Sequence, residues 1–301
     1  MTRVLVIGGV TASGKTAAAI EIAKALGGEL VGADSVQVYR GFDIGSAKPT
    51  AEELGGVRHH LIDVLDPDQD IDAARYAELA SAAIEDIAAR GKLPIVVGGT
   101  GLWMRALLRG LVELPEPDPA VRARIEAEHD AVGGPAMHAR LRRLDPRAAA
   151  RIHPNDRRRI VRALEVLEQT GRPLGELWEE HARGALRYDA RCYALDRPRD
   201  ELYAAIRARV RAMLDAGWVE ETRALLERFG PDVRPMQSVG YRQIVEHLRD
   251  GVPLEDTERR IVKATRIYTR RQRTWFRNEP EFAWTTAAEL VRLAREGGVA
   301  P

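Results

Sequence analysis

Near its start the chain reads Arg3-Val4-Leu5-Val6-Ile7-Gly8 and continues with Gly9-Val10-Thr11-Ala12-Ser13-Gly14-Lys15-Thr16. The first run has the composition of a short buried strand, and the second is a complete G-x-x-x-x-G-K-[ST] phosphate loop. A helical pattern begins near Gly14, so backbone N–H groups of the turn can converge on phosphate oxygens. The Thr16 hydroxyl is the predicted Mg²⁺ ligand. We predict that a diphosphate or triphosphate is bound by Gly9, Thr11, Ala12, Ser13, Gly14, Lys15 and Thr16.

Apolar runs alternate with amphipathic segments up to Arg109. The predicted strands are Val4–Gly8, Leu30–Ala33, His60–Val64 and Leu93–Gly98. The predicted helices are Gly14–Leu26, Asp72–Arg90 and Leu102–Arg109. Continuous apolar strands separated by helices indicate an α/β fold with a parallel sheet flanked by helices, as in P-loop NTPases. Ligands then bind along the edge where the strands' carboxyl ends meet.

Three prolines at Pro115, Pro117 and Pro119 mark a change of pattern. Beyond them the chain shows helical periodicity and no convincing strand. The predicted helices are Val121–His129, Met137–Leu144, Arg147–Ile152 and Asp156–Thr170. We expect the last helix to be capped by Asn155 or Asp156 and stopped by Gly171. We therefore predict a first part of the core at residues 1–114, an all-helical insertion at 115–190, and a return to the core at 191–301.

The return begins with the predicted strand Cys192–Leu195. Helical patterns follow, and Phe282–Trp284 is predicted as a last edge strand. The predicted helices of this part are Arg199–Ala216, Val219–Phe229, Gly240–Arg249, Leu254–Arg277 and Ala287–Arg295.

Composition limits the class of protein. With 301 residues and 45% apolar content, the chain can bury a sizeable core. Its single cysteine, Cys192, excludes an internal disulfide framework and a Cys-rich zinc site, and we expect it to be a small buried residue. No apolar run approaches membrane-spanning length, and since the first strand begins at once, we expect no signal peptide. We expect a monomeric, cytoplasmic protein.

The net charge of +1 does not by itself favour a nucleic-acid partner, but the charges are unevenly distributed. Arg259–Arg277 contains eight cationic residues and no acidic one. Arg147–Arg162 contains six arginines and a single aspartate. A genomic preference for arginine explains the choice of Arg over Lys, but not clusters without carboxylates. Such clusters are typical of a surface that binds a phosphate backbone.

Asp34 follows the strand Leu30–Ala33, beside the predicted phosphate site. A carboxylate there can take a proton from an attacking nucleophile. It can equally cap a turn, since Asp-Ser is a common capping pair, and the sequence leaves both roles open. The pair His59-His60 is better explained by local packing than by a metal site.

The strand Leu93–Gly98 runs into Gly98-Gly99-Thr100-Gly101. Hydrolytic NTPases usually place an aspartate near this point to hold the magnesium shell. Its absence argues against a motor ATPase or a GTPase. The small residues form a tight turn and also predict close approach of a substrate or polymer backbone.

Cations alternate with aromatic residues along the predicted C-terminal helix. Tyr268 and Trp275 could stack on bases while the arginines contact phosphates. The alternative, which we favour for the aromatic side chains, is that Tyr268, Trp275 and Phe276 form the buried face.

Together these segments resemble the bacterial type of the tRNA dimethylallyltransferase (isopentenyltransferase) family, along nearly the whole chain. The ordered motifs are more specific than the phosphate loop alone. They are Gly9–Thr16, Asp34–Gly41 with Asp43–Pro49, Gly98–Leu102, His153–Asp156 with Arg158–Ile160 and Arg162–Val166, Val239–Gln243 and Arg271–Arg277.

The resemblance implies transfer of a dimethylallyl group from dimethylallyl diphosphate to N6 of adenosine at tRNA position 37, with Mg²⁺ as cofactor. The phosphate loop would hold a leaving group, so no water-positioning acid is needed. The resemblance assigns Asp34 as the base, Arg209 as a second cation on the diphosphate, and Thr100 to placement of the adenine.

The resemblance also implies contact with the tRNA anticodon stem-loop through the helical insertion. The target base must be flipped out of its stack before it can react. Predicted tRNA contacts are Asp34, Ser35, Val36, Gln37, Arg122, Arg158, Arg159, Arg162, Gln237, Gly240, Tyr241 and Arg242.

Two other functions fit part of the pattern. A small-molecule kinase can share the phosphate loop and a carboxylate after the second strand, but it has no need for a basic C-terminal helix. A non-catalytic RNA-binding protein would explain the basic clusters, but not the intact Lys15, Thr16 and Asp34.

Overall fold

The computed structural model describes residues 1–182 and 184–299. They form two compact units, each described separately here: Met1–Leu108 with Leu186–Pro301, called the core unit, and Arg109–Ala185, called the insertion unit. The insertion predicted from the sequence ran from residue 115 to residue 190. The insertion unit ends before residue 190 because Asp189 and Ala190 already pair with Arg3 and Val4 in the sheet.

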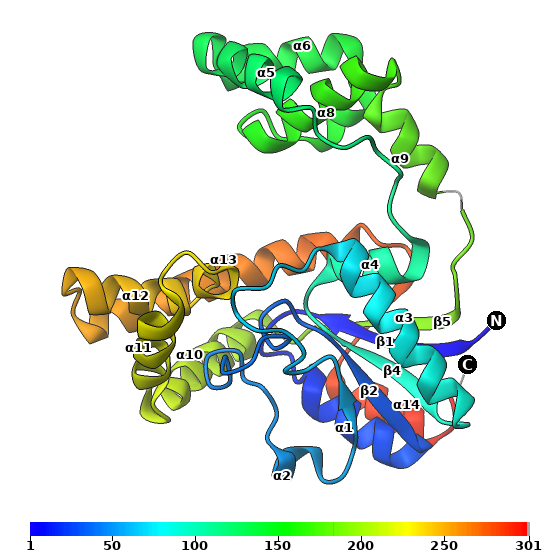
Figure 1. Ribbon diagram of the computed structural model, residues 1–301. Coiled ribbons are helices and arrows are strands. Elements are labelled where there is room, and N and C mark those ends of the chain that lie inside the picture. Colours follow the sequence, from blue (N-terminus) through cyan, green and yellow to red (C-terminus); the bar gives the residue numbers. More distant parts are fainter. Residues whose placement is uncertain (183, 300–301) are drawn as a thin grey trace. The chain divides into compact units, whose positions relative to one another are not determined.

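Within the described residues, the core unit contains a six-stranded sheet in the order β3-β2-β4-β1-β5-β6 (Figure 1). Every neighbouring pair is parallel, as the apolar strand pattern predicted. The strands are β1 (Arg3–Gly9), β2 (Gly28–Ala33), β3 (His59–His60), β4 (Leu93–Gly98), β5 (Asp189–Leu195) and β6 (Phe282–Thr285). The P-loop NTPase-like architecture is therefore confirmed, and β6 is an edge strand.

Helices of the core unit cover both faces of the sheet. They are α1 (Lys15–Leu26), α2 (Ala51–Leu54), α3 (Ala73–Ala89), α4 (Gly101–Arg109), α10 (Arg199–Asp215), α11 (Trp218–Phe229), the 3-10 turn η1 (Arg234–Gln237), α12 (Tyr241–Asp250), α13 (Leu254–Arg277) and α14 (Ala287–Arg295). Leu5 and Ile7 of β1 pack with α1 and α14, whereas Val4 and Val6 pack on the opposite face with α3, α4 and α10–α13. This alternation follows from the two-residue period of a strand.

The third predicted strand, His60–Val64, is wrong in extent. β3 contains only His59 and His60. Leu61 and Asp63 adopt positive φ values of 62° and 55°, so the chain leaves the extended conformation directly after the pairing with β2.

The insertion unit is all-helical within its described residues. Its helices are α5 (Pro119–Val132), α6 (Gly134–Leu144), α7 (Pro146–Arg151), α8 (Arg157–Thr170) and α9 (Leu174–Ala182). They share a separate apolar core that includes Ile125, Leu141, Ile160 and Leu164. The sequence did not predict α9, which starts directly after Pro173. The Gly175 N–H in its first turn donates at 2.8 Å to Oδ2 of Asp145, the residue between α6 and α7.

Asp156 and Gly171 set the limits of α8. The Asp156 carboxylate accepts a hydrogen bond from the Arg159 N–H at 3.2 Å, and Gly171 ends the helix at φ 69°. Of the two caps that the sequence left open, the structure has Asp156, and Gly171 is the predicted stop. In the described chain, no helix combines the length and apolarity that crossing a membrane requires.

Candidate active site

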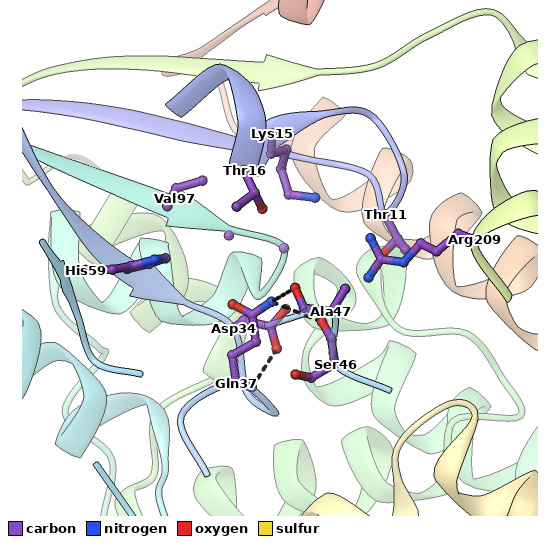
Figure 2. Close-up of a pocket in the computed structure, with 12 residues that line it drawn as sticks. Thr11, Lys15, Thr16, Asp34, Gln37, Ser46, Ala47, His59, Val97 and Arg209 are labelled. Carbon is purple, nitrogen blue, oxygen red and sulfur yellow. Dashed lines mark hydrogen bonds between the residues drawn. The ribbon is translucent and has the colours of Figure 1, made fainter. Parts of the chain in front are cut away.

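A pocket opens at the carboxyl edge of the parallel sheet, in the core unit (Figure 2). Segments distant in sequence meet there: the turn between β1 and α1, the loop after β2, strands β3 and β4, and α10. The pocket is lined by Thr11, Lys15, Thr16, Asp34, Gln37, Ser46, Ala47, His59, Val97, Gly98, Gly99 and Arg209.

The phosphate loop has the backbone geometry of an anion site. A Cβ on Gly9 would lie 2.3 Å from the Leu195 carbonyl oxygen, so only glycine fits there. Ala12 and Gly14 have φ values of 64° and 91°, which curl the chain into the start of α1. Gly14 supplies no side-chain cap, so the first-turn N–H groups of α1 have no side-chain acceptor at the N-cap. Such amides favour a bound anion.

Two cations and one carboxylate set the charge of the pocket. The Lys15 ammonium donates to the Val10 carbonyl at 2.9 Å. Burial and the nearby Arg209 lower the pKa of Lys15 to about 8, against the opposing effect of Asp34. Burial also lowers the pKa of Arg209, and Asp34 raises it. Since a diphosphate would relieve the repulsion between the two cations, the pocket is suited to that anion.

The two roles left open for Asp34 use different oxygens. Oδ1 accepts hydrogen bonds from the N–H groups of Val36 at 2.9 Å and Gln37 at 3.3 Å, which caps the turn after β2. Oδ2 accepts none from the described residues, and Figure 2 shows the carboxylate at the pocket. The cap therefore holds the carboxylate in place and leaves one oxygen for a proton.

Thr100 contacts the turn after β2 and is not among the residues that line the pocket. Its Oγ1 accepts a hydrogen bond from the Ser35 N–H at 3.1 Å. The hydroxyl thus joins the turn after β4 to the residue that follows Asp34. The structure places Thr100 as a support for the position of Asp34.

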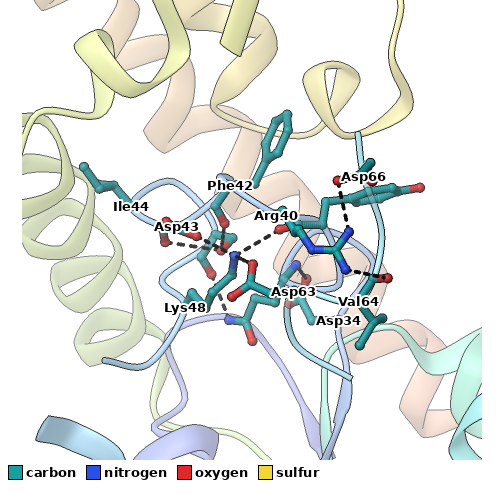
Figure 3. A network of polar contacts seen from close by, with 12 residues as sticks. Asp34, Arg40, Phe42, Asp43, Ile44, Lys48, Asp63, Val64 and Asp66 are labelled. Atoms are coloured by element: carbon teal, nitrogen blue, oxygen red, sulfur yellow. Dashed lines mark hydrogen bonds and ion pairs between the residues drawn. The ribbon is translucent and has the colours of Figure 1, made fainter. Parts of the chain in front are cut away.

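A buried lysine organises the loop that forms the outer wall of the pocket (Figure 3). Lys48 donates to the Tyr39 carbonyl at 3.0 Å and to the carboxylates of Asp43 and Asp63, both at 2.5 Å. Gln37 donates through Nε2 to the carbonyls of Ser46 and Ala47, each at 3.0 Å. The predicted RNA contact Gln37 therefore lies in the pocket wall, held by its own loop.

The glycines at the end of β4 and in the turn after it lie where no side chain fits. A Cβ on Gly98 would lie 2.1 Å from the Ala33 carbonyl oxygen, and one on Gly99 would lie 2.4 Å from Gln272 Nε2. A Cβ on Gly101 would lie 2.2 Å from the Trp275 ring. These contacts exclude a side chain at all three positions, while the backbones of Gly98 and Gly99 line the pocket, so close approach of a substrate there stays a prediction.

Two residues of the site were not predicted from the sequence. Gln272 of α13 is buried and bonds to both the phosphate loop and the turn after β4. His59 lines the pocket, whereas His60 bonds through Nε2 to Glu29 Oε2 at 2.8 Å. Local packing thus accounts for His60, whereas the His59 ring packs beside Gly32 and also lines the pocket. In the described chain, no cluster of three or more metal-ligating side chains occurs.

The basic helix α13 is largely anchored to the core unit. Phe276 is buried against Phe282, and burial together with Asp34 raises the pKa of Tyr268 to about 12. Arg273 pairs with Asp196 at 2.6 Å. Its charge is therefore balanced by the residue that directly follows β5, which the sequence did not predict. Within the described residues of α13, the exposed cations without a carboxylate partner are Lys263, Arg270, Arg271 and Arg277, and Arg270 donates to the Tyr203 hydroxyl at 3.3 Å.

Of the predicted RNA contacts near α12, the structure separates exposed from buried residues. Gln237 and Arg242 are exposed. Tyr241 is fully buried, and its hydroxyl donates to Glu221 Oε1 at 2.6 Å. Gly240 is buried against Trp218. The prediction that the Tyr241 side chain contacts RNA is therefore wrong, because that ring belongs to the core.

In the insertion unit, Glu165 orients two of the predicted arginines. Its Oε2 accepts hydrogen bonds from Arg122 at 2.8 Å and from Arg162 at 2.9 Å. Arg159 pairs with Asp156 at 3.5 Å, while Arg158 is exposed and has no acidic partner among the described residues. Of the predicted contacts in the insertion unit, Arg158 is thus the one whose charge has no acidic partner among the described residues.

Comparison with known proteins gives concordant matches. The family model described as IPP transferase matches residues 37–279. A tRNA dimethylallyltransferase of Anaeromyxobacter dehalogenans (strain 2CP-C) is 54% identical over 282 residues, which cover 94% of each chain. Among solved structures, the tRNA isopentenylpyrophosphate transferase of Bacillus halodurans is 36% identical, with a TM-score of 0.73 over 99% of this chain and 97% of that one. A eukaryotic dimethylallyltransferase acting on tRNA is 28% identical, with a TM-score of 0.79 over 97% of this chain and 76% of that one.

Proposed function

The chain belongs to the IPP transferase family, and from that membership we propose that it transfers the dimethylallyl group of dimethylallyl diphosphate to N6 of adenosine 37 in tRNA, releasing diphosphate. One observation supports this most directly. The phosphate-loop residues Lys15 and Thr16 line the same pocket as the Asp34 carboxylate, so a leaving group and a proton acceptor can lie on either side of one reacting carbon.

The reaction needs few groups. The N6 lone pair forms a bond to the first allylic carbon while the bond from that carbon to the diphosphate oxygen breaks, and diphosphate leaves with the electron pair. Asp34 Oδ2 takes the proton that N6 loses, which matters because a neutral exocyclic amine is a weak nucleophile. Lys15, Arg209 and the amides at the start of α1 stabilise charge on the departing diphosphate.

Mg²⁺ fits this donor set. The Thr16 hydroxyl lines the pocket together with a carboxylate, and the described residues contain no closed cluster of protein ligands, as suits an ion bound mainly through phosphate and water. When bound, Mg²⁺ supplies positive charge to the leaving diphosphate. Thr16 would hold it.

The proposal that this protein binds tRNA is supported by exposed cationic side chains outside the pocket. Arg158 in the insertion unit, and Lys263, Arg271 and Arg277 on α13, present charge to solvent without acidic partners among the described residues. Cations of this kind bind phosphate backbones and make the affinity salt-dependent.

A direct test separates this function from that of a small-molecule kinase. The protein is incubated with Mg²⁺, unmodified tRNA and either dimethylallyl diphosphate or ATP, and the digested nucleosides are analysed by mass. We expect adenosine to gain one five-carbon unit with the first donor and nothing with ATP. Phosphate transfer from ATP without prenylation would instead identify a kinase, and tRNA binding without either product would identify a binding protein.

A further inference from the structure

His59 is exceptional among the side chains that line the pocket. Both ring nitrogens are buried, and neither has a hydrogen-bond partner among the described residues. A buried polar group without a partner costs folding free energy, so such groups are rare unless a ligand completes them. The histidine beside it, His60, is fully engaged with Glu29. The two adjacent rings therefore have different roles.

The position of the ring is fixed by the sheet. His59 pairs with Leu30 in the β2–β3 ladder, and its Nε2 lies 3.4 Å from the place a Cβ on Gly32 would occupy. Gly32 in turn pairs with Val97 of β4, which also lines the pocket. Absence of a side chain at Gly32 thus gives the ring its space. Figure 2 shows the ring directed toward the region between Thr16 and Asp34.

Strand β4 supplies no acidic side chain to the magnesium side of the pocket. Hydrolytic P-loop enzymes hold the magnesium site with an aspartate near the end of the strand that corresponds to β4. Here that end is Gly98, where any side chain would collide with the Ala33 carbonyl at 2.1 Å. The two residues with which β4 ends in the pocket, Val97 and Gly98, carry no polar side chain, whereas β3 provides His59.

We propose that the His59 imidazole accepts a hydrogen bond from a water molecule bound to the Mg²⁺ that Thr16 and the diphosphate hold. The inference rests on the proposed diphosphate site and assigns to His59 a positioning role there. Metal-bound water is a strong donor, and outer-shell groups of this kind orient the metal's ligands. Burial, with a smaller effect of His60, lowers the pKa of His59 to about 4. The ring is therefore neutral near pH 7 and offers one acceptor nitrogen.

The ring nitrogens can be observed directly in the unmodified protein. Wild type labelled with ¹⁵N in its histidine rings is titrated with Mg²⁺, with inorganic pyrophosphate, and with both, and His59→Gln identifies the His59 signals. We expect these signals to shift only when Mg²⁺ and pyrophosphate are both present. A shift with pyrophosphate in the presence of a chelator would mean direct contact with phosphate and would overturn the proposal. Unchanged His59 signals, while phosphate-loop amide signals move, would overturn it too.

Affinity provides the second readout. Titration calorimetry with Mg²⁺ and pyrophosphate compares His59→Phe, which keeps a ring without nitrogens, with His59→Gln, whose amide oxygen can still accept. We expect about tenfold weaker binding for H59F and a smaller loss for H59Q. The matched control, His60→Gln, should bind as wild type does. Equal affinity of H59F and wild type contradicts the proposal alone, whereas failure of wild type to bind pyrophosphate removes the proposed function as well.

Discussion

Gln272 accepts a hydrogen bond from the backbone N–H of Thr11 through Oε1, at 2.8 Å, although 261 positions separate the two residues. Its Nε2 donates to the Gly99 carbonyl at 3.0 Å. One buried amide from α13 thus holds the phosphate loop and the turn after β4 at a set distance from each other. The bond also uses the Thr11 N–H, which leaves the amides at the start of α1 for the diphosphate.

Replacing Gln272 should loosen the diphosphate site. Gln272→Met keeps the length of the side chain and loses both hydrogen bonds, so we expect about tenfold weaker pyrophosphate binding by calorimetry. Gln272→Glu should bind still more weakly, because its carboxylate cannot donate to Gly99 and places negative charge near the anion. Thr274→Ala, an exposed change on the same helix, is the control. If Q272M binds as T274A does, Gln272 has no positioning role.

Two substitutions separate the capping and proton-accepting roles of Asp34. Asp34→Asn keeps an oxygen for the Val36 and Gln37 N–H groups and loses basicity. We expect turnover to fall by about 10²–10⁴-fold, while pyrophosphate affinity stays the same or rises because a negative charge has gone. Single-turnover prenylation and calorimetry measure the two quantities.

Asp34→Ala also removes the turn cap, so we expect its free energy of unfolding to be about 1 kcal/mol lower than that of D34N, as measured by thermal melts. Prenylation by D34N at a rate close to that of wild type would rule out the carboxylate as the base.

Diphosphate affinity should depend on pH through Lys15. Its pKa of about 8 means that the free protein loses this charge as the pH rises above 8. Because an anion favours the charged form, binding takes up a proton there, and affinity should fall by up to about tenfold per pH unit above pH 8. Calorimetry with pyrophosphate between pH 7 and about 10 measures the slope.

Lys15→Arg is the control for that slope. Arginine stays charged across the range, while pyrophosphate itself titrates equally in both experiments. The difference between the two curves therefore reports Lys15. Parallel curves would show that the ammonium is already fully charged at high pH in the free protein.

The exposed and the anchored arginines of the insertion unit should respond differently. We expect Arg158→Ala to weaken tRNA binding with little loss of stability and to reduce the slope of log affinity against log salt by about one. Arg162→Ala should in addition lower the free energy of unfolding by about 2 kcal/mol, since buried Glu165 loses one of two partners. Filter binding at several salt concentrations and thermal melts provide the measurements. An unchanged salt slope for R158A would exclude a phosphate contact there.

The sequence by itself determined the framework of this protein. Apolar runs of strand length, a phosphate loop between strand and helix, and caps such as Asp156 and Gly171 are local signals, because each depends on residues a few positions apart. They predicted the parallel sheet, the all-helical insertion and most helix limits. Motifs in a fixed order also identified the family, as the comparisons confirm.

Only the tertiary structure decided which side chains support the pocket and which predicted surface side chains are buried or paired. Gln272 of α13 hydrogen-bonds to the phosphate loop. The Tyr241 side chain is buried in the core, and Arg273 forms an ion pair with Asp196. The space that a side chain at Gly98, Gly99 or Gly101 would need is likewise filled by the chain's own atoms. These outcomes depend on packing between segments far apart in sequence, and no local pattern encodes them. The same holds for His59 and His60: adjacent residues of one strand face opposite sides of a sheet, so one ring lines the pocket and the other pairs with Glu29.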